Sequence, residues 1–152
     1  MTVRRGRPAD EPALRRLQTH LREPSPSLLS HGLRTGGVLV DAATPAADTT
    51  GGTGGGDPAG YLLAVAGDGL HVAELVVRPA RRREGRASAL LSRLLADATG
   101  PVTLLVAVDN GPARRLYDSL GFERVERRPA FYDDGTDALL LVGDPAQAAD
   151  DR

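Results

Sequence analysis

The stretch VRPARRREGRASALL, residues 77–91, decides the fold. The apolar run Leu70–Val77 leads into it and predicts a buried strand, and apolar residues at helical spacing follow Gly85. A turn that joins a strand to a helix leaves free backbone N–H groups at the helix start, and these groups attract anions. Arginines crowd this turn, at Arg78, Arg81, Arg82, Arg83 and Arg86. The stretch therefore predicts a pyrophosphate-binding turn. Because it lacks the lysine of phosphate-transferring loops, it should hold a cofactor without transferring its phosphate.

Strands and helices alternate outward from this turn. Apolar periodicity and turn residues predict strands at Thr2–Arg5, Gly37–Asp41, Tyr61–Ala66, Leu70–Val77, Val102–Val108, Phe122–Tyr132 and Ala138–Val142. They predict helices from an N-cap at Asp10 through Arg22, and at Ser25–Leu33, Arg86–Ala98 and Ala113–Leu120. The central strand–helix–strand–helix order is typical of a βαβ crossover flanked by hairpins. We expect one α/β domain, a mixed sheet flanked by helices, over residues 1–143. A flexible Gly-rich connection over 42–58 and a disordered tail over 144–152 complete the chain.

Composition excludes several function classes. The 152 residues carry a net charge of −1, which argues against binding polyanions such as nucleic acids. The chain has no cysteine and three scattered histidines, so we expect no thiolate nucleophile and no metal site. No apolar run is long enough to span a membrane, and we expect a cytoplasmic protein. All 19 basic residues are arginine, a sign of a G/C-rich genome, which makes the only asparagine, Asn110, more informative.

Two motifs together resemble a known family. Arg82-x-x-Gly85-x-Ala87, after a strand ending Val77-x-Pro79, is similar to the acetyl-CoA motif of the GNAT N-acetyltransferase superfamily. The stretch NGPARRLYDSLGF, residues 110–122, resembles that family's Asn-x-x-Ala-x-x-Leu-Tyr-x-x-x-Gly-Phe signature, in the expected order. Residues 127–141 further resemble the branch that acetylates ribosomal-protein alanines. The similarity covers about residues 59–142, and residues 1–58 match only in element order.

The resemblance implies a role for each motif residue. Backbone groups of Leu75, Val76 and Val77 would pair with the pantetheine arm of acetyl-CoA. The pyrophosphate would lie against the turn formed by Arg82, Arg83, Glu84, Gly85, Arg86, Ala87 and Ser88. Asn110 would contact the cofactor near its amide or thioester, although Gly111-Pro112 after it also suits a helix cap. Tyr117 would be the general acid that protonates the departing thiolate, although it could instead be a core aromatic. A phenol with a pKa near 10 can return a proton to a thiolate.

One position departs from the family pattern. Leu105 occupies the place where the alanine-acetylating branch has a glutamate base. His71 and Glu74, on the strand before the turn, are the alternative candidates for the base. Deprotonating a lysine amine at pH 7 costs about 4–5 kcal/mol, but an α-amine costs only about 1 kcal/mol. A site without the family's glutamate base therefore favours α-amines or other amines of low pKa as acceptors.

These observations predict an N-acetyltransferase in which an amine attacks acetyl-CoA directly. The first expected acceptor is a peptide N-terminus, and the second is a small amine. The sequence does not decide whether the protein forms a homodimer. A non-catalytic acetyl-CoA-binding regulator is the alternative that Leu105 suggests. A nucleic-acid-binding module built on the arginines is a weaker alternative, because no aromatic residues interleave with them.

Overall fold

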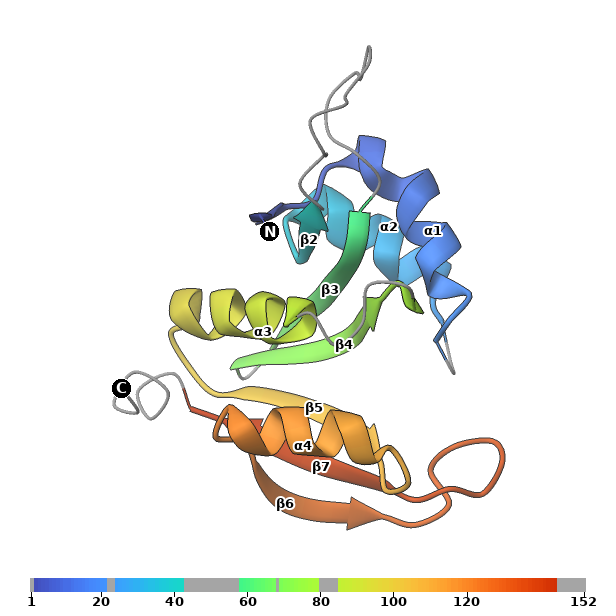
Figure 1. Ribbon diagram of the computed structural model, residues 1–152, viewed down its shortest axis with the longest axis vertical. Coiled ribbons are helices and arrows are strands. Elements are labelled where there is room, and N and C mark those ends of the chain that lie inside the picture. Colours follow the sequence, from blue (N-terminus) through green and yellow to red (C-terminus); the bar gives the residue numbers. More distant parts are fainter. Residues whose placement is uncertain (1, 22–23, 43–57, 68, 80–84, 145–152) are drawn as a thin grey trace. The chain divides into compact units, whose positions relative to one another are not determined.

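The computed structural model describes residues 2–21, 24–42, 58–67, 69–79 and 85–144 (Figure 1). The Gly-rich connection, apart from its ends, lies outside these residues. So do Arg82, Arg83 and Glu84 of the predicted pyrophosphate turn, and residues 145–152 of the predicted tail. The chain forms two compact units, the first from Met1–Val65 with Glu74–Arg93 and the second from Ala66–Ala73 with Leu94–Arg152.

The strands form a mixed seven-stranded sheet in the order β1-β2-β3-β4-β5-β7-β6. Their bounds are β1 Thr2–Arg5, β2 Val38–Ala42, β3 Pro58–Gly67, β4 Gly69–Val77, β5 Val102–Ala107, β6 Glu123–Arg128 and β7 Ala138–Gly143. All seven predicted strands are present, so the predicted α/β class with a mixed sheet is confirmed. No helix among the described residues is both long and apolar enough to cross a membrane.

The first unit packs helices on antiparallel strands. β1 pairs with β2, and β2 pairs with β3, both antiparallel. The short 3-10 helix η1 (Pro8–Asp10) precedes α1 (Glu11–Gln18) and α2 (Pro26–Thr35), and the unit also holds the start of α3 (Arg86–Asp97). Figure 1 shows α1 and α2 side by side next to β2 and β3. Leu14, Leu29, Val38 and Leu62 are fully buried and form its core.

The first helix differs from its prediction at both ends. Asp10 precedes α1, but its carboxylate does not cap that helix. It accepts a hydrogen bond from the Arg7 backbone N–H at 2.8 Å and pairs with Arg4 at 2.8 Å. The helix ends at Gln18 and not at Arg22, because the backbone N–H groups of residues 19–21 bond three residues back and tighten into turns.

The predicted crossover joins β4 to β5. β4 and β5 run parallel, paired through Leu70–Val72 and Val102–Leu104, and α3 connects them along the chain. β7 pairs antiparallel with β5 on one side and with β6 on the other. In Figure 1, helix α4 (Gly111–Ser119) lies along β5 and β7. The βαβ prediction is therefore confirmed.

The sixth predicted strand, Phe122–Tyr132, is too long. β6 ends at Arg128, whereas the apolar and aromatic residues that follow predicted a strand through Tyr132. Pro129 has no N–H to donate to a ladder, and Ala130 has φ +49, a left-handed conformation that non-glycine residues rarely adopt. The predicted Asp133-Asp134-Gly135 turn is confirmed, since the Gly135 N–H bonds the Tyr132 carbonyl at 2.9 Å and Gly135 has φ +87.

Candidate active site

The start of α3 combines a left-handed glycine with a buried ion pair. Gly85 has φ +79, which explains why glycine stands immediately before the helix. Arg86, the first residue of α3, directs its guanidinium to Asp41 on β2, at 3.0 and 3.2 Å from the two carboxylate oxygens. The Asp41 side chain is fully buried and that of Arg86 is 9% exposed. The Arg86 guanidinium therefore serves this buried ion pair, unlike the phosphate-facing arginine that the sequence suggested.

The other candidate cofactor residues of the first unit flank this helix start. Val76 and Val77 are buried on β4, while Leu75 is half-buried. A side chain on Gly60 of the neighbouring β3 would stand 2.5 Å from the Val76 carbonyl, so the two strands approach closely there. Ala87 and Ser88 are half-buried in the first turn of α3. These residues supply backbone groups and small side chains, as binding an extended cofactor arm requires.

Glu74 is buried on β4 and fully engaged. Its Oε1 accepts hydrogen bonds from Tyr61 Oη at 2.7 Å and Gln18 Nε2 at 3.0 Å. Its Oε2 accepts one from the Ser25 backbone N–H at 2.9 Å. Burial, together with the bond to Glu74, raises the pKa of Tyr61 far above its usual range, so Tyr61 stays a donor. Glu74 thus ties α1 and the segment before α2 to the strands.

His71 lies in the second unit and is half-buried on β4. Its Nδ1 is 2.8 Å from Oγ1 of Thr103, the residue opposite it on β5. Burial lowers the pKa of His71, and the nearby Arg128 guanidinium lowers it further. The ring is therefore neutral at pH 7. Its Nε2 has no hydrogen-bond partner within the described part of the chain, which leaves it able to accept a proton.

Asn110 caps α4. Its Oδ1 accepts a hydrogen bond from the Ala113 backbone N–H at 3.3 Å, and Pro112 follows in the first turn. The capping role that the sequence suggested is confirmed. The side chain is exposed, and its Nδ2 donors make no bond to other described residues.

Tyr117 is buried on α4, and its hydroxyl is not completely enclosed. The side chain is 8% exposed and packs edge-on against Phe122, with ring centroids 5.9 Å apart. The hydroxyl has no hydrogen-bond partner among the described residues. No buried polar side-chain atom described here lacks a partner, so this oxygen must be solvent-accessible. Burial raises the pKa of Tyr117 to about 12, with a further rise from the neighbouring Tyr132. The side chain is thus a core aromatic that also presents a neutral phenol.

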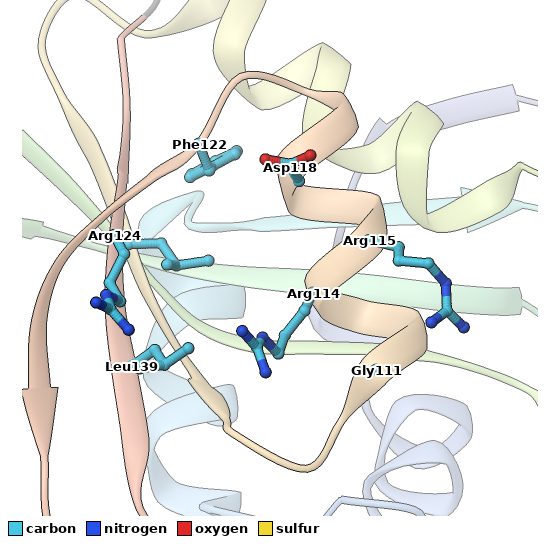
Figure 2. Close-up of a pocket in the computed structure, with 8 residues that line it drawn as sticks. Gly111, Arg114, Arg115, Asp118, Phe122, Arg124 and Leu139 are labelled. Atoms are coloured by element: carbon cyan, nitrogen blue, oxygen red, sulfur yellow. The ribbon is translucent and has the colours of Figure 1, made fainter.

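An open surface pocket of about 460 Å³ lies beside α4, on the side that carries Gly111, Arg114 and Asp118 (Figure 2). Three arginines, one aspartate and three large apolar residues are among the residues that line it: Gly111, Arg114, Arg115, Asp118, Phe122, Arg124, Leu139 and Leu141. In Figure 2, Arg114 extends from α4 toward Leu139 on β7. None of the predicted site residues lines this pocket, so the pocket is not the predicted site.

Leu105 is half-buried on β5, directly opposite Leu140 on β7. The position that holds a base in the alanine-acetylating branch is therefore part of an apolar cross-strand pair. Among the described residues, no three His, Cys, Asp or Glu side chains gather in a way that could hold a metal ion.

The fold and both motifs now point to one family. A family model described as the acetyltransferase (GNAT) family matches residues 14–122. The chain belongs to the GNAT family. The resemblance predicted from the two motifs is confirmed.

Known members of the GNAT family differ in what they acetylate. This chain is 46% identical over 70 residues to a mycothiol acetyltransferase of Clavibacter michiganensis subsp. michiganensis; the match covers 45% of this chain but only 23% of that relative. A chain of the NatC complex bound to Gag peptide and CoA has the same fold, with a TM-score of 0.79 and 18% identity over 94% of this chain and 97% of that one. The ribosomal-protein-S18-alanine N-acetyltransferase of Escherichia coli gives a TM-score of 0.73 and 23% identity over 93% and 91%.

Sequence patterns did not reveal the partners of the site residues. Thr103 beside His71, Asp41 beside Arg86, and Gln18 and Tyr61 around Glu74 all come from distant parts of the chain. One signal was available for Asp41: it is the acidic residue at the end of an otherwise apolar strand, Val38–Val40. A carboxylate there needs a cation or several donors when the strand is buried.

Proposed function

We propose that this GNAT protein is an N-acetyltransferase that moves acetyl from acetyl-CoA directly to a primary amine. In the step proposed, the amine nitrogen bonds to the thioester carbonyl carbon and the carbon–sulfur bond breaks. The nitrogen loses a proton to a base, and the departing thiolate gains one from an acid. The two proton transfers balance, and no acyl-enzyme forms. The chain has no cysteine that could carry one.

Tyr117 carries this proposal. Its ring is buried but its hydroxyl is not completely enclosed, and with a pKa of about 12 it is protonated at neutral pH. A neutral phenol can donate a hydrogen bond to sulfur as negative charge develops there, and can then pass on its proton. We assign it as the general acid.

We assign the base role to His71 in preference to Glu74. The Glu74 carboxylate already accepts three hydrogen bonds, whereas His71 is neutral and its Nε2 is available. A histidine of lowered pKa is a weak base, which suits an acceptor whose own pKa is low. Deprotonation at pH 7 costs an α-amine about 1 kcal/mol, against about 4–5 kcal/mol for lysine. We therefore propose a peptide N-terminus as the first acceptor class and a small amine as the second.

The residues of the first unit fit acetyl-CoA as co-substrate. The α3 N-terminus after Gly85 offers backbone N–H groups to a pyrophosphate, and β4 offers backbone groups at Leu75, Val76 and Val77 to the pantetheine arm. The exposed Asn110 amide would meet the cofactor near its thioester. We propose that the reaction takes place in the cytoplasm and uses no metal ion.

Release of CoA from acetyl-CoA tests the proposal. Because the chain has no cysteine, a thiol reagent reports only the CoA released. The panel comprises peptides with free N-termini, N-terminally blocked lysine peptides and small amines. We expect turnover to be fastest with free N-termini. Faster acetylation of lysine side chains would overturn the acceptor class, and failure to bind acetyl-CoA would overturn the proposal.

The Leu105–Leu140 pair favours a second candidate, a regulator that binds acetyl-CoA without turning it over. Tyr117→Phe separates the two. An enzyme loses turnover while keeping its affinity for acetyl-CoA, whereas a regulator has no turnover to lose.

A further inference from the structure

The turn between β6 and β7 contains a left-handed alanine that is bonded to the carboxylate of Asp137. Ala130 has φ +49, the only left-handed non-glycine residue described. Its backbone N–H donates to Asp137 Oδ1 at 2.8 Å. The other oxygen of that carboxylate accepts from Arg127, from Nε at 2.8 Å and from the terminal nitrogen at 2.7 Å. An alanine in this conformation needs such outside support, because the Cβ atom makes positive φ unfavourable.

The same residue ties the turn to the segment that begins α4. The Asp137 carbonyl accepts a hydrogen bond from the Val108 backbone N–H at 3.0 Å, two residues before the cap Asn110. The Val108 carbonyl in turn accepts from Arg114 on α4 at 2.9 Å. Asp137 thus joins the β6–β7 turn and the helix that carries Tyr117.

The turn carries two aromatic rings. Phe131 and Tyr132 pack edge-on, with centroids 5.1 Å apart and planes at 89°. The Tyr132 phenol adds to the rise in the pKa of Tyr117, of which burial is the larger cause. Phe131 is 39% exposed, so its packing alone does not fix the turn.

We propose that Asp137 is a positioning residue that fixes the 129–136 turn, with Tyr132, against the α4 segment bearing Tyr117. This inference rests on the proposed function, because it assigns Asp137 to the surroundings of the general acid. Asp137 acts through Tyr132 and Tyr117 and does not itself touch the substrate. A misplacement of about 1 Å in such a site can cost on the order of 10²-fold in rate.

The test uses the full chain and a rescue. Asp137→Ala removes both carboxylate contacts, and Ala130→Gly removes the need for them, since glycine adopts positive φ without strain. We expect Asp137→Ala to lower kcat at least about tenfold with acetyl-CoA affinity unchanged, and Asp137→Ala with Ala130→Gly to recover most of the loss. Asp133→Ala, which removes an exposed carboxylate from the same turn, is the matched control and should behave as wild type.

Two readouts keep the inference separate from the proposed function. Hydrogen exchange of residues 129–137 should speed up in Asp137→Ala and slow again in the double variant. The ionisation of Tyr117, followed by absorbance, should shift to lower pH in Asp137→Ala. A variant that loses thermal stability but keeps kcat, exchange and tyrosine ionisation would overturn the inference. If Tyr117→Phe leaves turnover intact, the general-acid assignment fails, whereas failure to bind acetyl-CoA defeats the proposed function; in both cases hydrogen exchange still decides whether Asp137 fixes the turn.

Discussion

The buried pair between Arg86 and Asp41 allows a prediction that separates a structural arginine from a phosphate-binding one. The change is Arg86→Met, which keeps the aliphatic length of the side chain and removes its charge. It leaves the fully buried Asp41 carboxylate without the guanidinium that now lies 3.0 Å away. Removing one partner of a buried pair costs about 3–5 kcal/mol, because the remaining charge is still desolvated.

Such a loss is large beside the whole stability of a domain. A domain of this kind is stable by about 5–15 kcal/mol. For a chain of this size, each kcal/mol moves Tm by about 2–4 °C, so Arg86→Met should lower Tm by roughly 6–20 °C. The double variant Asp41→Ala with Arg86→Met removes both charges and should regain at least half of the lost free energy, because no buried charge is left unpaired.

Urea unfolding gives the free energies, and calorimetric titration of acetyl-CoA gives the affinity. We expect the affinity of folded Arg86→Met to stay within about threefold of wild type, since the guanidinium faces Asp41. The exposed pair Arg15–Glu11 supplies the control, and Arg15→Met should barely change stability. A free energy of unfolding for Arg86→Met within about 1 kcal/mol of wild type would refute the reasoning. Lost acetyl-CoA affinity at unchanged stability would refute it as well.

Three further predictions follow from the buried titratable groups. Because the pKa of Tyr117 is raised from 10 to about 12, the folded state keeps a proton that the unfolded state loses above pH 10. Stability should therefore fall by about 2–3 kcal/mol between pH 10 and 12, and Tyr117→Phe should remove that part of the loss in alkaline urea titrations. Because the pKa of His71 is lowered, the free energy of unfolding should fall as pH drops below about 6.5. His71→Gln should weaken this acid-side pH dependence. An unchanged pH dependence would contradict a lowered pKa for His71. Glu74→Ala leaves the Gln18 and Tyr61 donors unpaired, which costs about 1–3 kcal/mol for each donor. It should therefore lower the free energy of unfolding more than Glu74→Gln does. Equal losses in the two variants would contradict the hydrogen-bond network.

Local patterns predicted the parts of the fold that local physics decides. The strand–turn–helix around Gly85 and the crossover from β4 to β5 follow from apolar periodicity and one glycine. The α4 start was also predictable, because Asn110-Gly-Pro carries its own cap. Predictions failed where tertiary partners decide. Asp10 looks like a cap but pairs with Arg4, and beyond Pro129 the Ala130 N–H donates to the Asp137 side chain instead of extending β6.

The same division holds for the site. Tyr117 was found by its motif, but its burial and its neighbour Tyr132 depend on how the later hairpin folds. Arg86 is one of five arginines around the predicted turn, and no local sequence pattern indicates that its side chain pairs with Asp41. Both candidate bases were named together, and only their hydrogen bonds, three to Glu74 and one to His71, distinguish them.

The steady-state rate of Tyr117→Phe tests the central claim most directly. Acetyl-CoA and the best peptide acceptor are held saturating, acetylated product is counted by mass spectrometry, and acetyl-CoA affinity is measured on the same sample. Loss of a general acid should reduce kcat by about 10²–10⁴-fold, with affinity unchanged. A variant that turns over at the wild-type rate would contradict the assignment of Tyr117 as the proton donor.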